Sequence, residues 1–574
     1  MRKWKTERKR TMKKKVIPVL VAVALIIVIG GAGLLTMFLK KYSYSDGKMD
    51  LDEYFGFLEP DEAAIVLQDE QIETRARLSG GTYYLDFISV QKLLNDRFYA
   101  DTAEMLLLYT TPTEIIRTTI GTDIYRQGDN EVKEDYLLSY YEGETLYVAL
   151  DFVHQFTNFS YETFTEPNRL QIYTEWGEST IAEVKKDTAI RYKGGVKSDI
   201  LREVSRGEQV TILEKMENWS KVKTQDALIG YVENKLLAEE EVIARTPASH
   251  YEEPEYTSLT REEKISLGWH QVMSEAANGT LAEAVSGTKG MNVISPTWFS
   301  LIDNEGGIRS IASQNYVNQA HQMGLEVWAL VDNFDQNVSS YEVLSRTSTR
   351  TRLIDNLMGE VLRYDIDGIN VDFEDLSYDS GEPFIQFLRE LSIRCRANGI
   401  VLSVDNYVPR ESTMHYDRKE QGIVADYVII MGYDEHWGGG GVAGSVASIG
   451  FVEDGIVQTV EEVPPHKVIN ALPFYTRVWK TQNGQVTSEA LDMETAQNFV
   501  ANNNVEVYWD QETCQNYGQI QKADTLYQVW LEDAKSIETK LTIMQKYNLG
   551  GVAAWKLGFE TPDIWGVIAA YTNS

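Results

Sequence analysis

The sequence predicts an α/β protein whose C-terminal half is a (β/α)₈ barrel, preceded by smaller domains and one apolar helix. Three observations predict this order. Short apolar runs alternate with helical patterns from residue 263 onward, β-rich runs with turn residues precede them, and an uncharged stretch lies near the N-terminus. At 574 residues the chain is too long for one domain, and length alone predicts several.

The N-terminal stretch predicts a membrane anchor. Residues 1–15 are strongly basic, and residues 16–39 follow without a charged side chain. This run is longer than the roughly 20 residues that a helix needs to cross a bilayer. It is also longer than the apolar core of a signal peptide, which has about 7–15 residues. The heavier basic flank is N-terminal, which predicts a cytoplasmic tail at 1–15, a single transmembrane signal anchor at 16–39 and an extracellular body. A cleaved signal peptide is the alternative.

Charge and cysteine content exclude several classes of function. The chain has a net charge of −32, although residues 1–41 carry eleven Lys or Arg side chains and one Glu. Because phosphate recognition needs clustered cations, so acidic a body excludes nucleic-acid binding. Cys395 and Cys514 are the two cysteines, and they show no metal or redox spacing. We expect no metal and no cofactor; disulfide pairing, protein partners and oligomeric state stay open.

Residues 42–175 contain an internal duplication. Four residues of the first copy, Tyr84, Val90, Asn95 and Phe98, recur 63 positions later as Tyr147, Val153, Asn158 and Tyr161. Each copy combines strands with a short helix, predicted at Ser89–Phe98 in the first. The segment resembles the small α+β module at the N-terminus of copper amine oxidases and of bacterial surface proteins, without a copper site. This resemblance implies a stalk that acts as a spacer or contacts the wall.

Residues 179–238 change to short β-rich runs at Thr188–Tyr192, Gln209–Glu214, Trp219–Lys223 and Ile229–Val232. Turn residues such as Gly194 and Gly195 separate the runs, as in a small barrel. The order of "AIRYKGG", "GEQVTILEKMENWSKVKT" and "IGYVENKLL" resembles a bacterial SH3-like domain, a module that commonly holds cell-wall peptides. Residues 239–262 are acidic and lack periodicity, which predicts a linker.

Eight strand-like runs alternate with helices such as Thr349–Tyr364 and Pro383–Asn398 over residues 263–574. The runs are Ile265–Trp269, Met291–Pro296, Glu326–Val331, Gly368–Phe373, Val401–Val404, Tyr427–Gly432, Val468–Leu472 and Gly551–Trp555. This alternation predicts a (β/α)₈ barrel. A doubly wound open sheet is the alternative, but no early strand is followed by a Gly-rich phosphate loop.

The stretch from Asp365 to Leu376 alternates apolar and polar residues with the period of a strand. Asn370, Asp372 and Glu374 therefore share one face of that strand. A solvated outer face would explain them, yet parallel strands in such folds are covered on both sides. Carboxylates are costly to bury. Their convergence at the mouth of a barrel therefore predicts an active site.

The other predicted strand ends add aromatic and acidic side chains to the same rim. They are Trp269, Trp298, Asp332, Asn406, Tyr433, Asp434, Tyr475 and Trp555. Aromatic faces stack on the apolar faces of sugar rings, and carboxylates act on glycosidic oxygens. The rim therefore predicts a site for a sugar polymer.

Three motifs carry a family resemblance. "DGINVDFE" resembles the D-G-x-D-x-D-x-E strand of glycoside hydrolase family 18, the chitinase family. Met431–Asp434 is similar to its M-x-Y-D motif, and Trp555 takes the place of the tryptophan on its eighth strand. The resemblance covers residues 263–574. The runs Met431–Trp437 and Trp530–Ile537 are most similar to the spore-cortex and cell-wall lytic branch of that family.

The resemblance implies the roles of the site residues. Glu374 would be the general acid, Asp372 would orient the substrate's 2-acetamido group as the internal nucleophile, and Tyr433 would hold the acetamide oxygen, giving retention. The residues expected to bind substrate are Asn370, Asp434, Trp555, Trp269, Trp298, Tyr475 and Trp437. Asn370 stands where the family has an aspartate, and we expect its amide to donate to Asp372.

These features together predict a membrane-anchored, extracellular, retaining glycoside hydrolase. Its expected substrate is the β-1,4 bond after N-acetylglucosamine in peptidoglycan, because an anchor, a stalk and an SH3-like module would hold the barrel near the wall. The alternatives are hydrolysis of chitin or chitooligosaccharides, and a non-catalytic protein that binds wall glycans through the same barrel.

Overall fold

The computed structural model describes the backbone of residues 2–246 and 251–573, with side chains from residue 16. Residues 247–250 of the predicted linker and the side chains of the predicted tail 1–15 lie outside this description. The chain forms two compact units. Residues 1–96 and 134–253 make up the first unit, and residues 97–133 and 254–574 the second.

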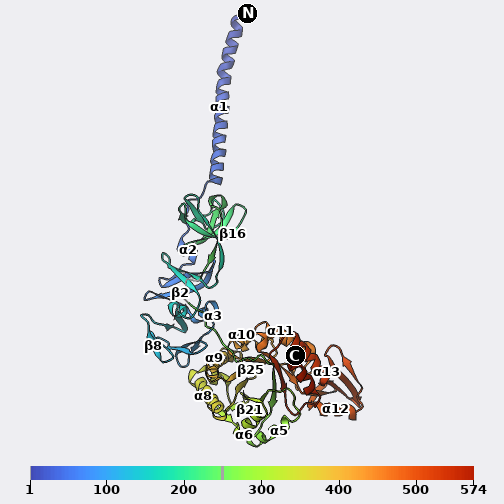
Figure 1. Ribbon diagram of the computed structural model, residues 1–574. Helices are drawn as coiled ribbons and strands as arrows, with labels where there is room; N and C mark the ends of the chain where they lie inside the picture. Colours follow the sequence, from blue (N-terminus) through green and yellow to red (C-terminus); the bar gives the residue numbers. More distant parts are fainter. Residues whose placement is uncertain (1, 247–250, 574) are drawn as a thin grey trace. The chain divides into compact units, whose positions relative to one another are not determined.

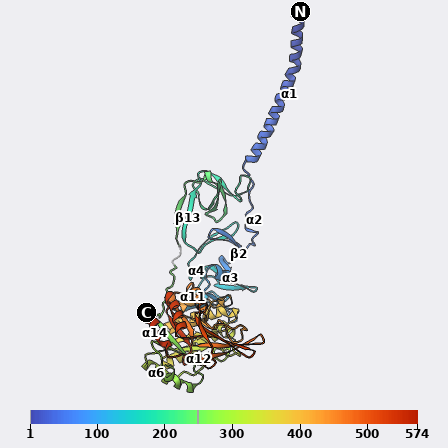
Figure 2. The same cartoon turned by 90° about the vertical axis from the view of Figure 1, so that its right-hand side faces the viewer.

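The N-terminal helix α1 runs from Arg2 to Tyr42 (Figures 1 and 2). Its apolar part, Val16–Tyr42, has 27 residues and a mean hydropathy of 2.7, and it is not buried against the rest of the chain. It extends three residues beyond the predicted anchor 16–39. By length and composition, this helix is able to cross a bilayer.

The SH3-like part of the first unit is one seven-stranded sheet in the order β15-β14-β18-β17-β16-β13-β19. The strands are β13 (Gly177–Glu183), β14 (Thr188–Arg191), β15 (Ile200–Val204), β16 (Gln209–Lys215), β17 (Trp219–Thr224), β18 (Ile229–Glu233) and β19 (Glu241–Arg245). The four predicted runs are strands within two residues of their expected bounds. Strand β19 lies in the segment predicted as a linker, and this part of the prediction was wrong, because β13 pairs with it along five residues.

The duplicated segment supplies the second sheet of this unit, in the order β11-β12-β1-β2-β3-β10-β9. Its strands are β1 (Glu62–Leu67), β2 (Glu70–Ser79), β3 (Thr82–Asp86), β9 (Ser139–Glu142), β10 (Thr145–Ala149), β11 (Ser160–Phe164) and β12 (Arg169–Tyr173). Short helices α3 (Phe87–Leu93) and α4 (Leu150–His154) follow β3 and β10. Both strand–helix pairs start 63 residues apart, as the repeat does. Helix α3 ends five residues before the predicted Phe98.

The rest of the first copy belongs to the second unit. Strands β4 (Phe98–Asp101), β5 (Leu106–Thr110), β6 (Ile115–Thr119), β7 (Ile124–Gln127) and β8 (Asn130–Lys133) form a five-stranded sheet in sequence order. The compact units therefore do not follow the predicted stalk boundaries of 42–175, because residues 97–133 group with the C-terminal half of the chain.

This five-stranded sheet contacts the helices of the barrel through hydrogen bonds. Helix α8 (Thr347–Tyr364) has no side-chain cap of its own. Instead, Thr347 N–H donates to Asp101 at 2.6 Å and Ser348 N–H donates to Glu104 at 3.1 Å. Acceptors at these positions satisfy N–H groups that a helix leaves free in its first turn.

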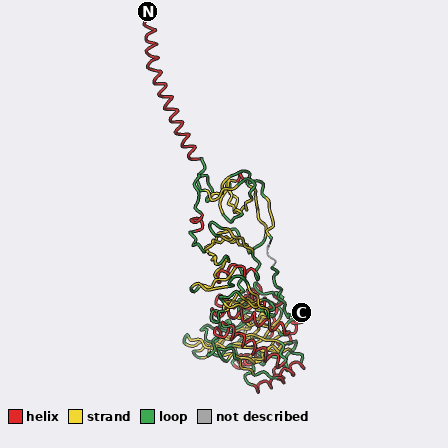
Figure 3. The backbone as a smooth tube through the Cα atoms, turned by 90° about the vertical axis from the view of Figure 1, so that its left-hand side faces the viewer, coloured by secondary structure: helices red, strands yellow, loops and turns green. Residues whose placement is uncertain are grey.

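The second unit contains a closed barrel of parallel strands, as predicted. The order is β20-β33-β27-β26-β25-β24-β23-β21, and β21 pairs with β20 to close the ring. The strands are β20 (Ile265–His270), β21 (Val293–Leu301), β23 (Glu326–Asp332), β24 (Gly368–Asp372), β25 (Val401–Tyr407), β26 (Tyr427–Met431), β27 (Val468–Pro473) and β33 (Gly551–Trp555). Figure 3 shows the strands of this unit among surrounding helices.

Helices α6 (Gln314–Gln322), α8, α9 (Gly381–Asn398), α10 (Arg418–Val424), α11 (Ile449–Val460), α13 (Ala534–Lys546) and α14 (Ile564–Thr572) lie between or after the strands. The sequence analysis missed an insertion between β27 and α13. It consists of β28 (Tyr475–Gln482), β29 (Gln485–Asp492), α12 (Met493–Asn502), β30 (Val507–Asp510), β31 (Gln515–Lys522) and β32 (Thr525–Leu531).

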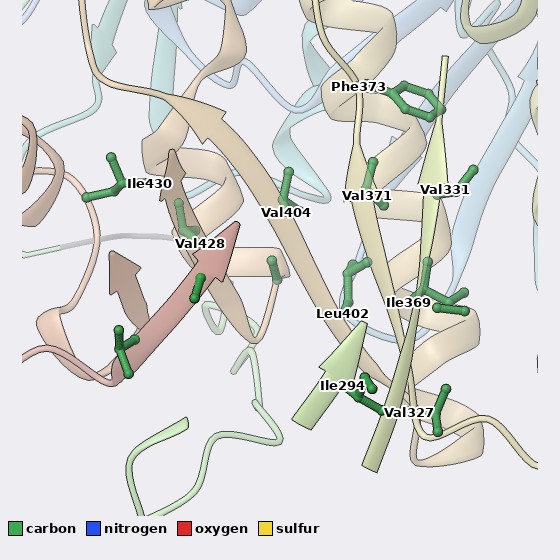
Figure 4. Packing of buried hydrophobic residues seen from close by; sticks show 14 of the residues in the cluster. Ile294, Val327, Val331, Ile369, Val371, Phe373, Leu402, Val404, Val428 and Ile430 are labelled. Carbon is green, nitrogen blue, oxygen red and sulfur yellow. The ribbon is translucent and has the colours of Figure 1, made fainter. Parts of the chain in front are cut away.

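Two hydrophobic layers result from the alternation along the barrel strands. Side chains such as Ile369, Val371 and Phe373 belong to the cluster between strands and helices (Figure 4). A separate cluster fills the barrel interior with residues of other strands, including Trp328. Strand β24 adds no apolar side chain to it, and a Cβ at Gly368 would lie 2.6 Å from the Trp328 ring. Glycine there makes room for the indole beneath the polar face of β24.

Candidate active site

The carboxyl ends of the barrel strands surround a cavity of about 210 Å³. Asp372, Glu374 and Tyr433, which come from two of the three sequence motifs, all line this cavity. The other lining residues are Trp269, Phe334, Asp405, Tyr407, Met431, Asp434, Tyr475 and Trp555. The pair of acidic residues therefore faces a ring-lined cavity and not bulk solvent.

Asp372 is the last residue of β24 and is buried. Its Oδ1 atom has no hydrogen-bond partner among the described residues. Burial and the nearby carboxylates Asp405, Glu374 and Asp332 raise the pKa of Asp372 well above its ordinary value. An unpaired buried oxygen is costly, so this atom is arranged to accept a hydrogen bond from a ligand.

Glu374 follows β24 in a segment that two side chains hold in place. Its backbone N–H donates to the Asn333 amide oxygen at 2.9 Å, and the Asn333 amide nitrogen donates to its carbonyl at 2.8 Å. Tyr407 O–H donates to the Glu374 carboxylate at 2.6 Å. Burial raises the pKa of Glu374, the hydrogen bond from Tyr407 opposes this, and Asp375 and Asp434 add repulsion. A carboxyl group with a raised pKa keeps its proton closer to neutral pH, as a general acid requires.

The motif on β26 adds a phenol and a carboxylate. Tyr433 makes an edge-to-face contact with Tyr475 at 6.1 Å, and burial raises the pKa of its phenol well above the ordinary value. The phenol therefore stays protonated and acts as a hydrogen-bond donor. Tyr475 O–H donates to Asp434 at 2.7 Å, which fixes that carboxylate at the edge of the cavity.

Two wider cavities adjoin the central one. One, of about 610 Å³, shares Glu374, Tyr407, Tyr433 and Asp434 with it and extends to the half-exposed ring of Trp437. The other, of about 470 Å³, shares Asp372, Phe334 and Trp555 with it and includes Asp332. Glu374 therefore lies in the middle of a groove that continues on both sides, as a chain-like ligand requires.

Two residues predicted to bind substrate do not face this groove. Trp298 is buried, donates to Asn278 at 2.8 Å and packs edge-to-face on Tyr316 at 4.9 Å, so its ring belongs to the core. Asn370 is fully buried and does not line the cavity. The alternation along β21 turns Trp298 toward the core. Asn370 lies too deep in β24 to reach the cavity.

The prediction that the Asn370 amide donates a hydrogen bond to Asp372 was also wrong. The Asn370 amide nitrogen donates to Asp405 at 2.8 Å, while its oxygen accepts from Trp269 at 2.8 Å and from Ser295 at 3.1 Å. Asn370 therefore connects β24 with three other strands of the barrel beneath the cavity. The other predicted contacts, Trp269, Trp555, Tyr475, Asp434 and Trp437, line the central or the adjoining cavity.

Asp405 and Tyr407 were not predicted from the sequence, and Asn406 was predicted in their place. All three lie in β25, where alternation turns Asp405 and Tyr407 toward the cavity and Asn406 away from it. Asn406 donates to Gln421 at 2.7 Å behind the strand. The period of two places Asp405 and Tyr407 on one face of the strand and Asn406 on the other. Only the pairing of Ser403 with Asn370 in the structure identifies the face of Asp405 and Tyr407 as the inward one.

Asp372→Asn is expected to stabilise the protein near neutral pH. An unfolded Asp ionises near pH 4, whereas the folded pKa is higher. Between these two values the folded protein binds a proton that the unfolded chain has lost, so stability falls as pH rises. The variant removes this penalty and should gain about 1.4 kcal/mol for each pH unit between the two pKa values. Urea unfolding of the full chain in detergent should show the gain near pH 7 and none at about pH 3. An equal gain at both pH values would contradict it.

The barrel, Glu374 and the unpaired buried carboxylate of Asp372 in a ring-lined groove define a glycoside hydrolase. Residues 328–560 match the family described as "Glycosyl hydrolases family 18", and residues 186–238 match "Bacterial SH3 domain". The chain therefore carries a glycoside hydrolase family 18 domain preceded by a bacterial SH3 domain, which agrees with two of the three resemblances drawn from the sequence. The resemblance of residues 42–175 to the copper amine oxidase module stays a prediction.

Two relatives are each similar to a little under half of the chain. The chain is 25% identical over 298 residues to "Uncharacterized glycosylase YvbX" of Bacillus subtilis, covering 49% of this chain and 85% of the relative. It is also 25% identical over 265 residues to "Cortical fragment-lytic enzyme" of Bacillus anthracis, covering 44% of this chain and 61% of that enzyme. The alignment thus spans less than two thirds of the second relative.

The solved structure of the Bacillus cereus spore cortex-lytic enzyme SleL is 20% identical to the chain, with a TM-score of 0.49. The superposition covers 64% of this chain and 90% of SleL.

Proposed function

We propose that this protein is a membrane-anchored, extracellular glycoside hydrolase that cleaves β-1,4 bonds after N-acetylglucosamine in peptidoglycan, with retention of configuration. The observation that carries the proposal is the unpaired, buried oxygen of Asp372 in one cavity with Glu374 and Tyr433. An acetamide group offers an N–H and a carbonyl oxygen to such a site.

In the proposed reaction the substrate's acetamide is the nucleophile. Asp372 accepts the acetamide N–H, and Tyr433 donates to the acetamide oxygen, which places that oxygen below the anomeric carbon. Glu374 gives its proton to the departing glycosidic oxygen as the bond breaks. The acetamide oxygen bonds to the anomeric carbon, giving a cyclic oxazolinium ion whose positive charge Asp372 offsets.

The second half of the reaction returns the enzyme to its starting state. A water molecule gives a proton to the Glu374 carboxylate and attacks the anomeric carbon from the face that the leaving group vacated. The oxazolinium ring opens, and the acetamide is restored. Two displacements at one carbon give net retention.

The choice of peptidoglycan and the location rest on the other domains. Helix α1 would hold the chain in the membrane with residues 1–15 in the cytoplasm. Residues 42–96 and 134–175 would act as a spacer, and the SH3 domain would contact the wall. A relative carries the name "Cortical fragment-lytic enzyme", which is consistent with a wall glycan as substrate.

The test is digestion of purified sacculi by the full chain in detergent, followed by borohydride reduction and mass spectrometry. We expect new N-acetylglucosaminitol ends, and NMR of fresh products of an N-acetylglucosamine oligomer should show the β-anomer first. New muramitol ends would contradict the proposed bond. Turnover of chitin oligomers but not of sacculi would mean that chitin, and not peptidoglycan, is the substrate. Binding of sacculi without turnover would indicate a non-catalytic glycan-binding protein.

A further inference from the structure

Strand β25 places a second buried carboxylate beside Asp372. The parallel register pairs Asn370 with Ser403 and Val371 with Val404, so Asp372 and Asp405 are the next residues on the two strands. Asp405 is 2% exposed and Asp372 is 7% exposed, and both line the central cavity. The two acidic side chains thus share one desolvated space.

The hydrogen bonds to these two carboxyl groups are unequal. Asp405 Oδ1 accepts from the Asn370 amide at 2.8 Å. Asp372 Oδ1 has no partner within the described part of the chain. Because a donated hydrogen bond favours the ionised form of a carboxyl group, Asn370 favours a charge on Asp405 rather than on Asp372.

The groups that face this pair do not neutralise it. Glu374 and Asp332 are acidic groups that supply no positive charge, and Tyr433 is a neutral phenol. The ion pairs among residues 16–246 and 251–573 include neither Asp372 nor Asp405. Burial raises the pKa of both carboxyl groups, and repulsion from Asp405 adds to it at Asp372. Two adjacent carboxylates without a cation cannot both remain ionised in such a site.

We infer that Asp372 and Asp405 share a single proton, which rests on Asp372 in the free protein and moves to Asp405 when a ligand N–H binds Asp372. In the transfer one O–H bond breaks at Asp372 and one forms at Asp405, so the charge of the pair stays at −1. Asp405 is then a positioning residue, because it acts on the substrate through Asp372. The movement of the proton on ligand binding rests on the proposed function, whereas the sharing of the proton between Asp372 and Asp405 does not.

Infrared spectroscopy tests the shared proton without requiring activity. The background is Glu374→Gln, which removes the other carboxyl group with a raised pKa from the cavity. At neutral pH the full chain in detergent should show a C=O stretching band of a buried carboxylic acid that is lost in the double variant Glu374→Gln/Asp405→Asn. The asparagine still accepts from Asn370, so the hydrogen bond persists while the charge is removed.

Asp332→Asn in the same background is the matched control. Asp332 pairs in register with Asp372 on the opposite neighbouring strand, β23, but it accepts from Ser300 at 2.9 Å and from Phe334 N–H at 3.1 Å. We expect the band to persist in this variant. A band that survives Asp405→Asn but disappears with Asp372→Asn would mean that burial alone protonates Asp372, and would overturn the inference.

The pH profile of kcat/KM gives the second readout, in the variant Asp405→Asn alone. Without Asp405 no acceptor remains for the proton, so Asp372 must lose it to solvent before a ligand N–H can bind. The acidic limb should therefore move to higher pH by about one unit or more. A merely structural role of Asp405 would lower the rate without moving this limb. If the wild-type chain hydrolyses no glycan, the proposed function fails, yet the infrared comparison still decides the shared proton.

Discussion

Glu374→Gln is expected to lower kcat on wall glycan by about 10²–10⁴-fold, the usual contribution of a general acid. The amide has nearly the shape of the acid and still accepts a hydrogen bond from Tyr407, but it has no proton to give to the leaving oxygen. KM should change little, because the groove on both sides of residue 374 is unaltered. Initial rates on solubilised glycan strands measure both constants.

The control for this variant is Glu326→Gln. Glu326 begins β23 at the other end of the barrel and pairs with Arg261. Its replacement should leave kcat unchanged. In the wild type, activity should fall as pH rises through the raised pKa of Glu374, and Glu374→Gln should abolish this alkaline limb. Undiminished turnover by Glu374→Gln would eliminate Glu374 as the acid.

Glu420→Gln is expected to destabilise the second unit by about 3–5 kcal/mol, as breaking a buried ion pair does. Glu420 lies in α10 and accepts from Arg389 of α9 at 2.8 Å and from Arg97 at 3.0 Å. Burial alone would raise its pKa, but the two guanidinium groups lower it below the ordinary value. The variant removes the buried counter-charge that the two cations share. Urea unfolding of the full chain at neutral pH measures the loss.

Asp355→Asn serves as the exposed counterpart. Asp355 pairs at 2.8 Å with Arg394, on the same helix as Arg389, but the two side chains are about half exposed. Such a pair contributes about 0–1 kcal/mol. Equal losses in the two variants would contradict a buried network at Glu420. Because the pKa of Glu420 is lowered, its contribution to stability should be present at neutral pH and disappear as pH falls through the folded value.

The barrel could be predicted closely because its strands are apolar runs with clear breaks. Every predicted strand overlaps the observed one, and Asp372, Glu374 and Tyr433 meet in one cavity. Which face of β25 points inward depends on its register with β24. The sequence contains no direct record of that register, and Asp405 and Tyr407 were therefore missed.

Long-range packing limited the prediction in two other places. Trp298 ends an apolar run in the way that Trp269 does, yet only Trp269 lies inside the barrel. The duplication correctly placed strands and helices 63 residues apart, but similar sequences can pack against different neighbours. Tyr99 of the first copy donates to the Ser345 carbonyl, 246 residues away in sequence.

The caps that Asp101 and Glu104 provide for α8 have a practical consequence for anyone who expresses the hydrolase by itself. Helix α8 directly precedes β24, the strand that leads to Glu374. The N–H groups in the first turn of this helix are bonded by residues far upstream in the sequence. A recombinant fragment that starts at residue 263 would lack those acceptors and would expose surfaces that residues 97–133 normally cover. The shortest useful fragment therefore includes residues 97–133, although none of these residues lines the groove.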